Sequence, residues 1–359
     1  MRKLASIKRI SNLIPIEGKD RIELAIVDGW SVIVKKNEFS VGSKCVYCEI
    51  DSVLPDKPEF EFLRSNGFRI KTMKMSGVIS QGICFPINIL PEAQRNLDVG
   101  TDVTEIIGVV QYEKTMDKEP SIATKIPNKH YPKFLMKFNW FRTLIYKFDH
   151  KGNKAFPDFI SKTDETRIQN MPWILSTKAP FVATEKVDGQ SGSFALVKHD
   201  GIFGTKFEYI VCSRNLRLYN KDTSSYWNVS DRYNIESVLK NLIGNHNWVA
   251  IQGECVAPGV QGNKYKVTEP DLYVFNLIYP DGRVDSISAK TVCESNGLKF
   301  VPIIDKSYIL PDTVDEVLKF AHGKSKIGDT LREGVVFRDL CGKQSFKAVD
   351  PLFLLKYDE

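Results

Sequence analysis

The sequence lacks both an apolar run of membrane-spanning length and a secretion signal. No stretch reaches the roughly 18 consecutive apolar residues of a transmembrane helix, and residues 1–8 already carry Arg2, Lys3 and Lys8. The seven cysteines in 359 residues are an odd number, which favours a reducing compartment over a disulfide framework. We therefore expect a protein of the cytoplasm, or of the nucleus or nucleoid, that is neither secreted nor bound to a membrane.

Two common functional patterns are also missing. The sequence contains no Gly-x-x-x-x-Gly-Lys phosphate-binding loop, and its five histidines show no metal-ligand spacing. Cys45 and Cys48 form one Cys-x-x-Cys pair, whereas a structural zinc site normally needs a second pair. We expect neither a P-loop enzyme nor a zinc-stabilised fold.

The positive charge is concentrated in one middle segment. The chain has a net charge of +6, but residues 1–112 carry 15 basic and 14 acidic side chains, and residues 158–359 carry 25 basic and 26 acidic ones. Residues 113–157, with 10 basic and 4 acidic side chains, hold the excess. Aromatic rings alternate with these cations between His130 and Phe148.

Lysines neutralise phosphates and rings stack on bases, so this composition suits a polynucleotide-binding connector. A connector whose rings pack on its two neighbours would give the same composition, and both interpretations stay open. We expect a short helix within it, over residues 134–146.

The first 112 residues predict a small all-β module. Short apolar runs alternate with Gly and Pro turns, at residues 21–27, 30–34, 44–50, 68–75 and 82–87. This pattern is typical of an OB-type barrel, which commonly binds nucleic acid, and equally of an SH3-like barrel.

Residues 158–359 predict an α+β domain large enough to be catalytic. Helical patterns occur near 231–243, 288–296 and 312–322, and Thr163 or Asp164 could cap a further helix. Strands are expected near 181–186, 192–198, 208–213, 248–256, 271–278, 333–338 and 344–348.

The most informative motif is Glu185-Lys186-Val187-Asp188-Gly189, directly after an apolar run. A lysine is a nucleophile only when deprotonated, and its free pKa of about 10.4 forbids that near neutrality unless the site lowers it. Partial burial and a divalent cation held by Asp188 would lower it. Gly189 would let the backbone approach a phosphate or a base.

Five further short motifs follow in a fixed order. They are Cys212-Ser213-Arg214-Asn215, Gln252-Gly253-Glu254, Tyr273-Val274-Phe275, Glu333-Gly334-Val335-Val336 and Ser345-Phe346-Lys347. This ordered set resembles the six motifs of the covalent nucleotidyltransferases, the polynucleotide ligases and messenger-RNA capping enzymes. Each motif is weak alone, but six in order around a lysine are specific.

Within that superfamily the chain resembles the RNA ligase 5 family, of the Deinococcus–Naegleria type. DNA ligases and capping enzymes place an OB domain after the last lysine motif, whereas only 12 residues of this sequence follow Lys347. The segments from Lys162 to Asn170 and from Ser345 to Tyr357 resemble the same family. One departure is the last motif, which often reads Lys-x-Lys and here reads Lys347-Ala348-Val349.

The resemblance implies the fold and the organisation of the chain. We expect an N-terminal OB-like β-barrel at 1–112, a basic aromatic linker at 113–157, and a nucleotidyltransferase domain at 158–359. The last would be an ATP-grasp-like ligase domain of antiparallel sheets with flanking helices.

The resemblance also implies roles for individual residues. Lys186 would be the adenylated nucleophile, and Lys347 would contact the α-phosphate of ATP. Mg²⁺ or Mn²⁺ would bind at Asp188, Glu254 and Glu333. The remaining nucleotide-contacting residues would be Phe275 stacked on adenine, Glu185 at its amino edge, Arg214 and Asn215 at the ribose or 5′-phosphate end, and Arg167 on the nucleotide or polynucleotide.

The implied function is an ATP-dependent RNA ligase that seals 3′-hydroxyl/5′-phosphate breaks, acting as a monomer on RNA or RNA-containing nicked duplexes. Alternatives are a DNA ligase, a capping guanylyltransferase, or a non-catalytic nucleic-acid-binding protein with the same fold. The domain order argues against the first two, and the intact Lys186, Asp188, Glu254, Glu333 and Lys347 argue against the third.

Overall fold

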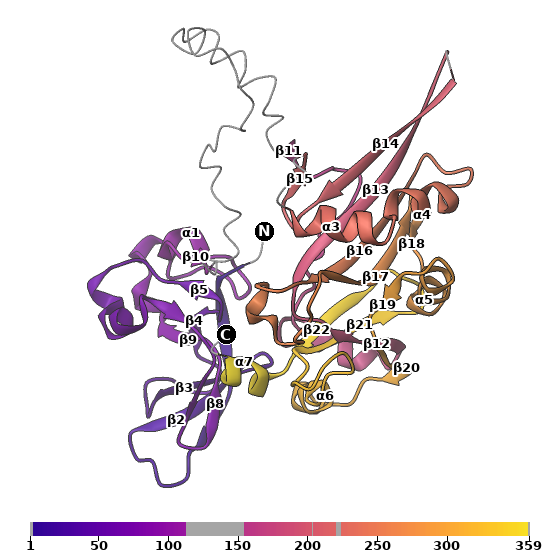
Figure 1. Ribbon diagram of the computed structural model, residues 1–359. Helices are drawn as coiled ribbons and strands as arrows, with labels where there is room; N and C mark the ends of the chain where they lie inside the picture. Colours follow the sequence, from indigo (N-terminus) through magenta and orange to yellow (C-terminus); the bar gives the residue numbers. More distant parts are fainter. Residues whose placement is uncertain (1–2, 113–153, 203, 220–223, 358–359) are drawn as a thin grey trace, which may run out of the picture.

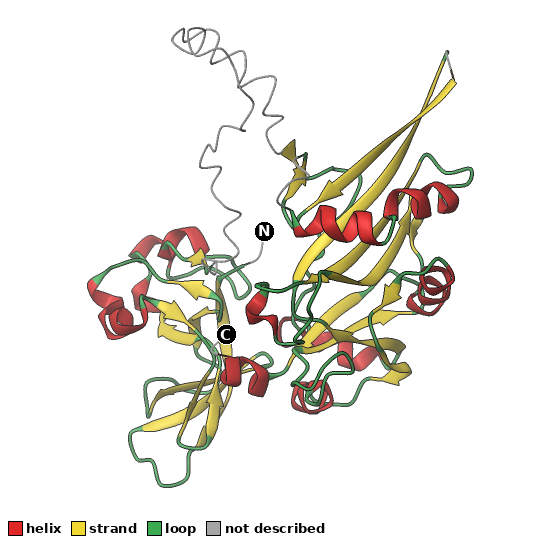
Figure 2. Ribbon diagram, in the orientation of Figure 1, coloured by secondary structure: helices red, strands yellow, loops and turns green. Residues whose placement is uncertain are grey.

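The computed structural model describes residues 3–112, 154–202, 204–219 and 224–357. They form an N-terminal β module and a larger C-terminal domain of antiparallel sheets with flanking helices (Figures 1 and 2). The expected α+β architecture is therefore confirmed. Most of the basic aromatic linker, including the helix expected at 134–146, lies outside the described residues.

The N-terminal module is built on an antiparallel sheet with the strand order β3-β2-β1-β4-β9. Asp28, with a positive φ of 51°, and Gly29 make the tight turn between β2 and β3 that their sequence predicts. The strands of this sheet are β1 (Ala5–Pro15), β2 (Ile22–Val27), β3 (Trp30–Lys35), β4 (Lys44–Cys48) and β9 (Ile83–Pro86). Short pieces complete the module: β5 (Ser52–Val53), β6 (Arg69–Ile70), β7 (Met73–Met75), β8 (Val78–Ser80), β10 (Val110–Gln111), α1 (Thr104–Ile107) and 3₁₀ turns at Pro58–Asn66, Ile87–Ile89 and Glu92–Gln94.

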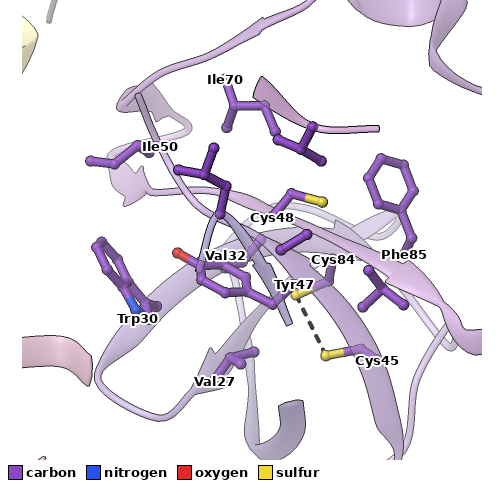
Figure 3. Close-up of a cluster of buried hydrophobic side chains, with 14 of the residues drawn as sticks. Val27, Trp30, Val32, Cys45, Tyr47, Cys48, Ile50, Ile70, Cys84 and Phe85 are labelled. Atoms are coloured by element: carbon purple, nitrogen blue, oxygen red, sulfur yellow. Dashed lines mark hydrogen bonds between the residues drawn. The ribbon is translucent and has the colours of Figure 1, made fainter. Parts of the chain in front are cut away.

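The Cys-x-x-Cys pair belongs to the core of this module. Figure 3 shows Cys45, Cys48 and Cys84 among Trp30, Tyr47 and other buried side chains. The sulfur atoms of Cys45 and Cys84 lie 4.0 Å apart, and the described residues contain no cluster of His, Cys, Asp or Glu able to hold a metal ion directly. These cysteines act as small apolar side chains.

The C-terminal domain contains two antiparallel sheets. The larger has the order β11-β15-β14-β13-β16-β17-β18, with β19 parallel to β17, and the smaller has the order β20-β12-β21-β22. The larger sheet comprises β11 (Lys154–Ala155), β13 (Gln190–Gly201), β14 (Gly204–Cys212), β15 (Leu216–Leu218), β16 (Trp248–Val256), β17 (Asp271–Tyr279), β18 (Gly282–Arg283) and β19 (Lys299–Phe300). The smaller comprises β12 (Pro180–Lys186), β20 (Ile303–Ile309), β21 (Gly334–Asp339) and β22 (Ser345–Val349).

Helices cover the outer face of each sheet. Apolar side chains of α3 (Ser225–Arg232), α4 (Ile235–Leu242) and α5 (Ser286–Ser295) share one core with the larger sheet, and α6 (Val314–Ala321) shares another with the smaller sheet. The last helix, α7 (Pro351–Tyr357), belongs to the core of the N-terminal module. Short 3₁₀ turns lie at Ile168–Asn170, Pro172–Thr177 and Gln261–Asn263. We call the face of the smaller sheet opposite α6 its inner face; Lys186 and Lys347 lie on it. The second face of the larger sheet carries a small apolar cluster that includes Ala195, Ile210 and Ala250.

Two helix predictions differ from the structure. The helix expected at 231–243 is divided into α3 and α4, because Asn234 adopts a left-handed φ of 47° between them. The helix expected to begin at Thr163 or Asp164 is absent: residues 161–166 are irregular, and only a 3₁₀ turn at Ile168–Asn170 follows. We call residues 161–167 the crossing segment, since its side chains contact both sheets and the module.

The C-terminal helix joins the two parts. Phe353 and Leu354 of α7 are buried in the core of the N-terminal module, and Figure 1 shows α7 between the module and the larger domain. A second contact joins the two parts: the amide of Gly29 donates to the carbonyl of Gln169 over 3.2 Å. A Cβ atom at Gly29 would lie 2.8 Å from the Cα of Gln169, so only glycine allows this approach.

No helix within the described ranges is long and apolar enough to cross a membrane.

Candidate active site

Lys186 ends β12 at the inner face of the smaller sheet. It pairs with Gly334 at the start of β21, which places Glu333 beside it, and Lys186 Nζ lies 2.6 Å from Glu333 Oε2. A Cβ at Gly334 would lie 2.2 Å from the carbonyl oxygen of Ala348, so β21 and β22 can pair here only around glycine. The Glu-Gly pair thus fixes a carboxylate against the candidate nucleophile.

Glu254 and Asp188 complete a group of three carboxylates around Lys186. Glu254 lies on β16, and the backbone amide of Gly189 donates to its carboxylate. The pKa of Glu254 is raised to about 8, chiefly by burial; Lys186 opposes the rise, and Glu333 and Asp188 add to it. The amide of Asp188 donates to the Tyr265 hydroxyl over 2.8 Å.

The surroundings of Lys186 act on its charge in two opposite directions. Burial lowers the pKa of its ammonium group, but Glu333, Glu254 and Asp188 outweigh burial, and the net pKa is raised above its ordinary value. The protein's own groups thus hold Lys186 protonated. A neutral, nucleophilic Lys186 requires added positive charge at the same carboxylates.

These carboxylates suit a hard divalent cation held through water. Oxygen donors and surplus negative charge are what Mg²⁺ and Mn²⁺ prefer, and Mg²⁺ commonly keeps several of its waters. Across the described ranges, no three acidic, histidine or cysteine side chains lie close enough to ligate one ion directly. The arrangement fits an ion whose remaining ligands are water and phosphate oxygens.

Lys347 shares the inner face with Lys186. Lys347 of β22 pairs with Val336 of β21, and Val336 pairs with Thr184 of β12. Thr184 is two residues before Lys186 in the same strand. Since side chains alternate along a strand, Lys347, Thr184 and Lys186 lie on one face of the sheet. The backbone amide of Lys347 donates to the Thr166 carbonyl over 2.8 Å, which attaches the crossing segment to β22.

Glu185 lies on the opposite face of the same sheet. Strand alternation directs it away from Lys186, and both of its oxygens accept hydrogen bonds, at 2.5 Å from Ser325 Oγ and at 2.8 Å from the Lys326 amide. Burial raises the pKa of the Glu185 carboxyl, and these hydrogen bonds oppose the rise. This carboxylate positions the segment around Ser325.

Phe275 faces the smaller sheet from β17. The register of β16 and β17 shifts between Gln252 and Gly253, so Phe275 has no direct cross-strand partner in β16. The guanidinium of Arg338 lies 5.5 Å from the centre of its ring. A half-buried ring at an irregular strand position, with a cation beside it, provides a surface for stacking.

Arg338 is not among the residues predicted from the sequence. It is buried, donates to Thr184 Oγ1 over 3.2 Å and lies 3.5 Å from Glu165 of the crossing segment. Burial lowers the pKa of Arg338 to about 10. The strand pattern could have indicated it: Arg338 is four residues after Gly334, which pairs with Lys186, so both positions lie on the same face of the strand.

The remaining predicted residues contact the crossing segment. Arg214 pairs with Asp164 at 2.5 Å, and Lys162 donates to Asn215 Oδ1 over 3.2 Å, both in exposed positions. Arg167 is directed toward the N-terminal module, where Nη2 lies 2.8 Å from Asp51 Oδ2. The structure thus gathers Asp188, Glu254 and Glu333 around Lys186 and places Lys347 on the same sheet face. It pairs Arg214 with Asp164 and Arg167 with Asp51.

Comparisons with known proteins agree with this architecture. A family model for RNA ligase matches residues 179–357, and one described as an OB-fold domain matches residues 4–87. No curated protein sequence gives a significant match.

Solved structures of the Naegleria gruberi RNA ligase match throughout. An apo variant is 30% identical over 99% of this chain and 98% of that chain, with a TM-score of 0.80. A variant with ATP and Mn is 30% identical over 100% of both chains, with a TM-score of 0.80. A variant with AMP and Mn is 31% identical over 99% of each chain, with a TM-score of 0.79. The similarity covers module and domain alike, and the chain belongs to the RNA ligase family that its motifs resemble, with an OB-fold module ahead of the ligase domain.

Proposed function

We propose that this protein is an ATP-dependent RNA ligase that seals breaks bearing 3′-hydroxyl and 5′-phosphate ends in RNA or in RNA-containing duplexes. The observation that carries the proposal is the environment of Lys186. Its ammonium group contacts Glu333, is surrounded by two further carboxylates, and shares a sheet face with Lys347. Solved forms of the related ligase include alanine variants of lysine, aspartate, glutamate and arginine residues, the same residue types.

In the first step, Lys186 Nζ forms a bond to the α-phosphorus of ATP while the bond to pyrophosphate breaks, leaving a lysyl–AMP. The ammonium group must first lose a proton, which the surrounding carboxylates oppose. A Mg²⁺ or Mn²⁺ ion at Asp188, Glu254 and Glu333 would offset their charge and stabilise negative charge on phosphate oxygens. Lys347, on the same face, would add positive charge at the α-phosphate.

Two further transfers complete sealing. The AMP moves from Lys186 to the terminal 5′-phosphate, which regenerates the free amine and forms an adenylylated end. The 3′-hydroxyl then attacks that end and AMP leaves. Each transition state carries charge on phosphate oxygens, so fixed cations and geometry matter more than general bases.

Nucleotide recognition would fall to residues around these lysines. Phe275 presents a ring for adenine, with Arg338 on its other side, and Glu185 would act through the nearby segment at Ser325. Arg214 and Asn215 would exchange their exposed partners for the ribose or the 5′-phosphate. Arg167 retains two buried donors, Nε and Nη1, that have no hydrogen-bond partner among the described residues, and these would serve a phosphate or a base.

The substrate would extend from the ligase domain over the rest of the chain. We assign polynucleotide binding to the OB-fold module (1–112) and the basic aromatic linker (113–157), and the chemistry to residues 158–359, in a monomeric enzyme. The positive charge excess of the linker suits a phosphate backbone.

The proposal is tested with full-length protein, Mg²⁺ or Mn²⁺, and α-labelled ATP or GTP, followed by nicked duplexes of defined strand composition. We expect a covalent adduct with ATP alone and sealing of nicks that contain RNA. An adduct with GTP would indicate capping chemistry, and equal sealing of an all-DNA nick would indicate a DNA ligase. Duplex binding without any adduct would indicate a non-catalytic protein.

A further inference from the structure

A lysine outside the six motifs contacts one of the candidate metal carboxylates. Lys264 lies in the loop between β16 and β17, and its ammonium nitrogen is 2.5 Å from Asp188 Oδ2. Both side chains are buried, with exposed fractions of 9% and 7%. The next residue, Tyr265, accepts the hydrogen bond of the Asp188 amide, so this loop holds both the backbone and the carboxylate of Asp188.

The same ammonium group faces two rings of the C-terminal helix. Lys264 Nζ lies 5.2 Å from the ring centre of Phe353 and 4.9 Å from that of Tyr357, both on α7. Phe353 is buried in the core of the OB-fold module. Lys264 thus connects a candidate metal carboxylate to the helix that anchors the module.

A buried cation is stable only with charge compensation, which Asp188 and the two rings provide. A divalent ion brought to Asp188 would meet this ammonium group as a like charge at short range, in a site shielded from solvent. The ion and Lys264 therefore compete for one carboxylate.

We propose that Lys264 is a resident counter-cation of Asp188 that sets the affinity of the site for divalent metal. This inference rests on the proposed function, because it takes Asp188 as a metal carboxylate. Lys264 acts here as a positioning residue: it holds the Asp188 carboxylate in place, and it yields that carboxylate when the ion binds.

The test measures Mn²⁺ binding to the full-length protein by calorimetry, without ATP. Lys264→Met keeps most of the apolar stem of the side chain and removes its charge, so the dissociation constant for Mn²⁺ should fall about tenfold. Lys264→Arg should remain near the parent value. Lys299→Met is the matched control, because Lys299 also lies 2.5 Å from an aspartate, Asp271, and near a tyrosine ring, but touches none of the candidate metal carboxylates.

A second measurement needs no variant. The rate at which an amine-specific acetylating reagent modifies Lys264, followed by mass spectrometry, should rise when Mn²⁺ is added to the parent, while the rate at Lys299 stays constant. An unchanged or weakened Mn²⁺ affinity in Lys264→Met, or an unchanged acetylation rate, would overturn the inference. A parent protein that binds no Mn²⁺ and forms no adduct would instead refute the proposed function itself.

Discussion

Arg167 and Asp51 form an ion pair across the boundary between the ligase domain and the OB-fold module, with 2.8 Å between Nη2 and Oδ2. The residue before Arg167 accepts the backbone hydrogen bond of Lys347. The position of the module is therefore tied, through two adjacent residues, to a candidate phosphate-binding lysine. A movement of the module when a polynucleotide binds would therefore displace Arg167 and Thr166, and with them the backbone of Lys347 in β22.

This pair separates the two roles open to Arg167. Asp51→Asn and Arg167→Met should each lower the free energy of unfolding, by about 1–3 kcal/mol for a partly exposed interface pair. If Arg167 also binds nucleotide through its other donors, Arg167→Met alone should raise the KM for ATP. Adenylation kinetics with both variants decide the matter, and equal KM values would make Arg167 a purely structural residue.

Glu333 should be needed for chemistry and not for folding. Glu333→Gln keeps the shape of the side chain and removes its charge, so adenylation should slow by roughly 10²–10³-fold, as when a charged group is lost from a phosphoryl-transfer site. The melting temperature should stay close to that of the parent. Glu236→Gln, which disrupts an exposed pair with Lys240, serves as the control and should adenylate normally.

The pH dependence of stability should report on Glu254. Its pKa is raised from 4.5 to about 8, mainly by burial, so the folded state binds this proton more tightly than the unfolded state does. Between these values the free energy of unfolding of the metal-free protein should fall as the pH rises. Urea denaturation in EDTA at about pH 5 and about pH 8 measures this slope, and Glu254→Gln should make it shallower. An unchanged slope would show that Glu254 ionises normally.

Docking of α7 should couple the stability of the two parts. Phe353→Ala removes a buried ring from the core of the module and should cost about 3–5 kcal/mol. Leu352→Ala, at a side chain that is 41% exposed, is the matched control and should cost little. If thermal unfolding of Phe353→Ala matches that of Leu352→Ala, the helix is not a structural part of the module.

The burial of α7 in the core of the module also predicts how a protein without the module and linker should behave. A fragment that begins near Phe156 would expose the apolar face of α7, so it should be less stable than the full chain even where it forms the adduct. Its duplex binding should also depend less steeply on salt, because the module and linker contribute phosphate contacts. Equal salt slopes for fragment and full chain would remove the module from substrate binding.

The local parts of the site could be predicted from the sequence. Five of the predicted site residues lie on or beside a strand with a strong apolar pattern, and those strands form close to where they were expected. They are Lys186, Glu254, Phe275, Glu333 and Lys347. The turn at Asp28-Gly29 formed for the same reason, since its conformation is encoded by adjacent residues.

Long-range contacts could not be predicted in this way. Lys264 meets Asp188 across 76 residues, and α7 reaches a core built from the first 110 residues. The helix expected at Thr163 fails because its residues are engaged elsewhere: Thr163 with Ser191, Asp164 with Arg214, and Glu165 with Ser345. Tertiary partners override a weak local helix signal there.

The most direct test of the account is to locate the nucleotide on the protein. Full-length protein incubated with ATP and Mn²⁺, then digested and analysed by mass spectrometry, should carry a single AMP on Lys186. Lys186→Ala should carry none, yet still join a pre-adenylylated 5′ end, since that step no longer needs the nucleophile. AMP found on another lysine, or an adduct that survives Lys186→Ala, would contradict the account.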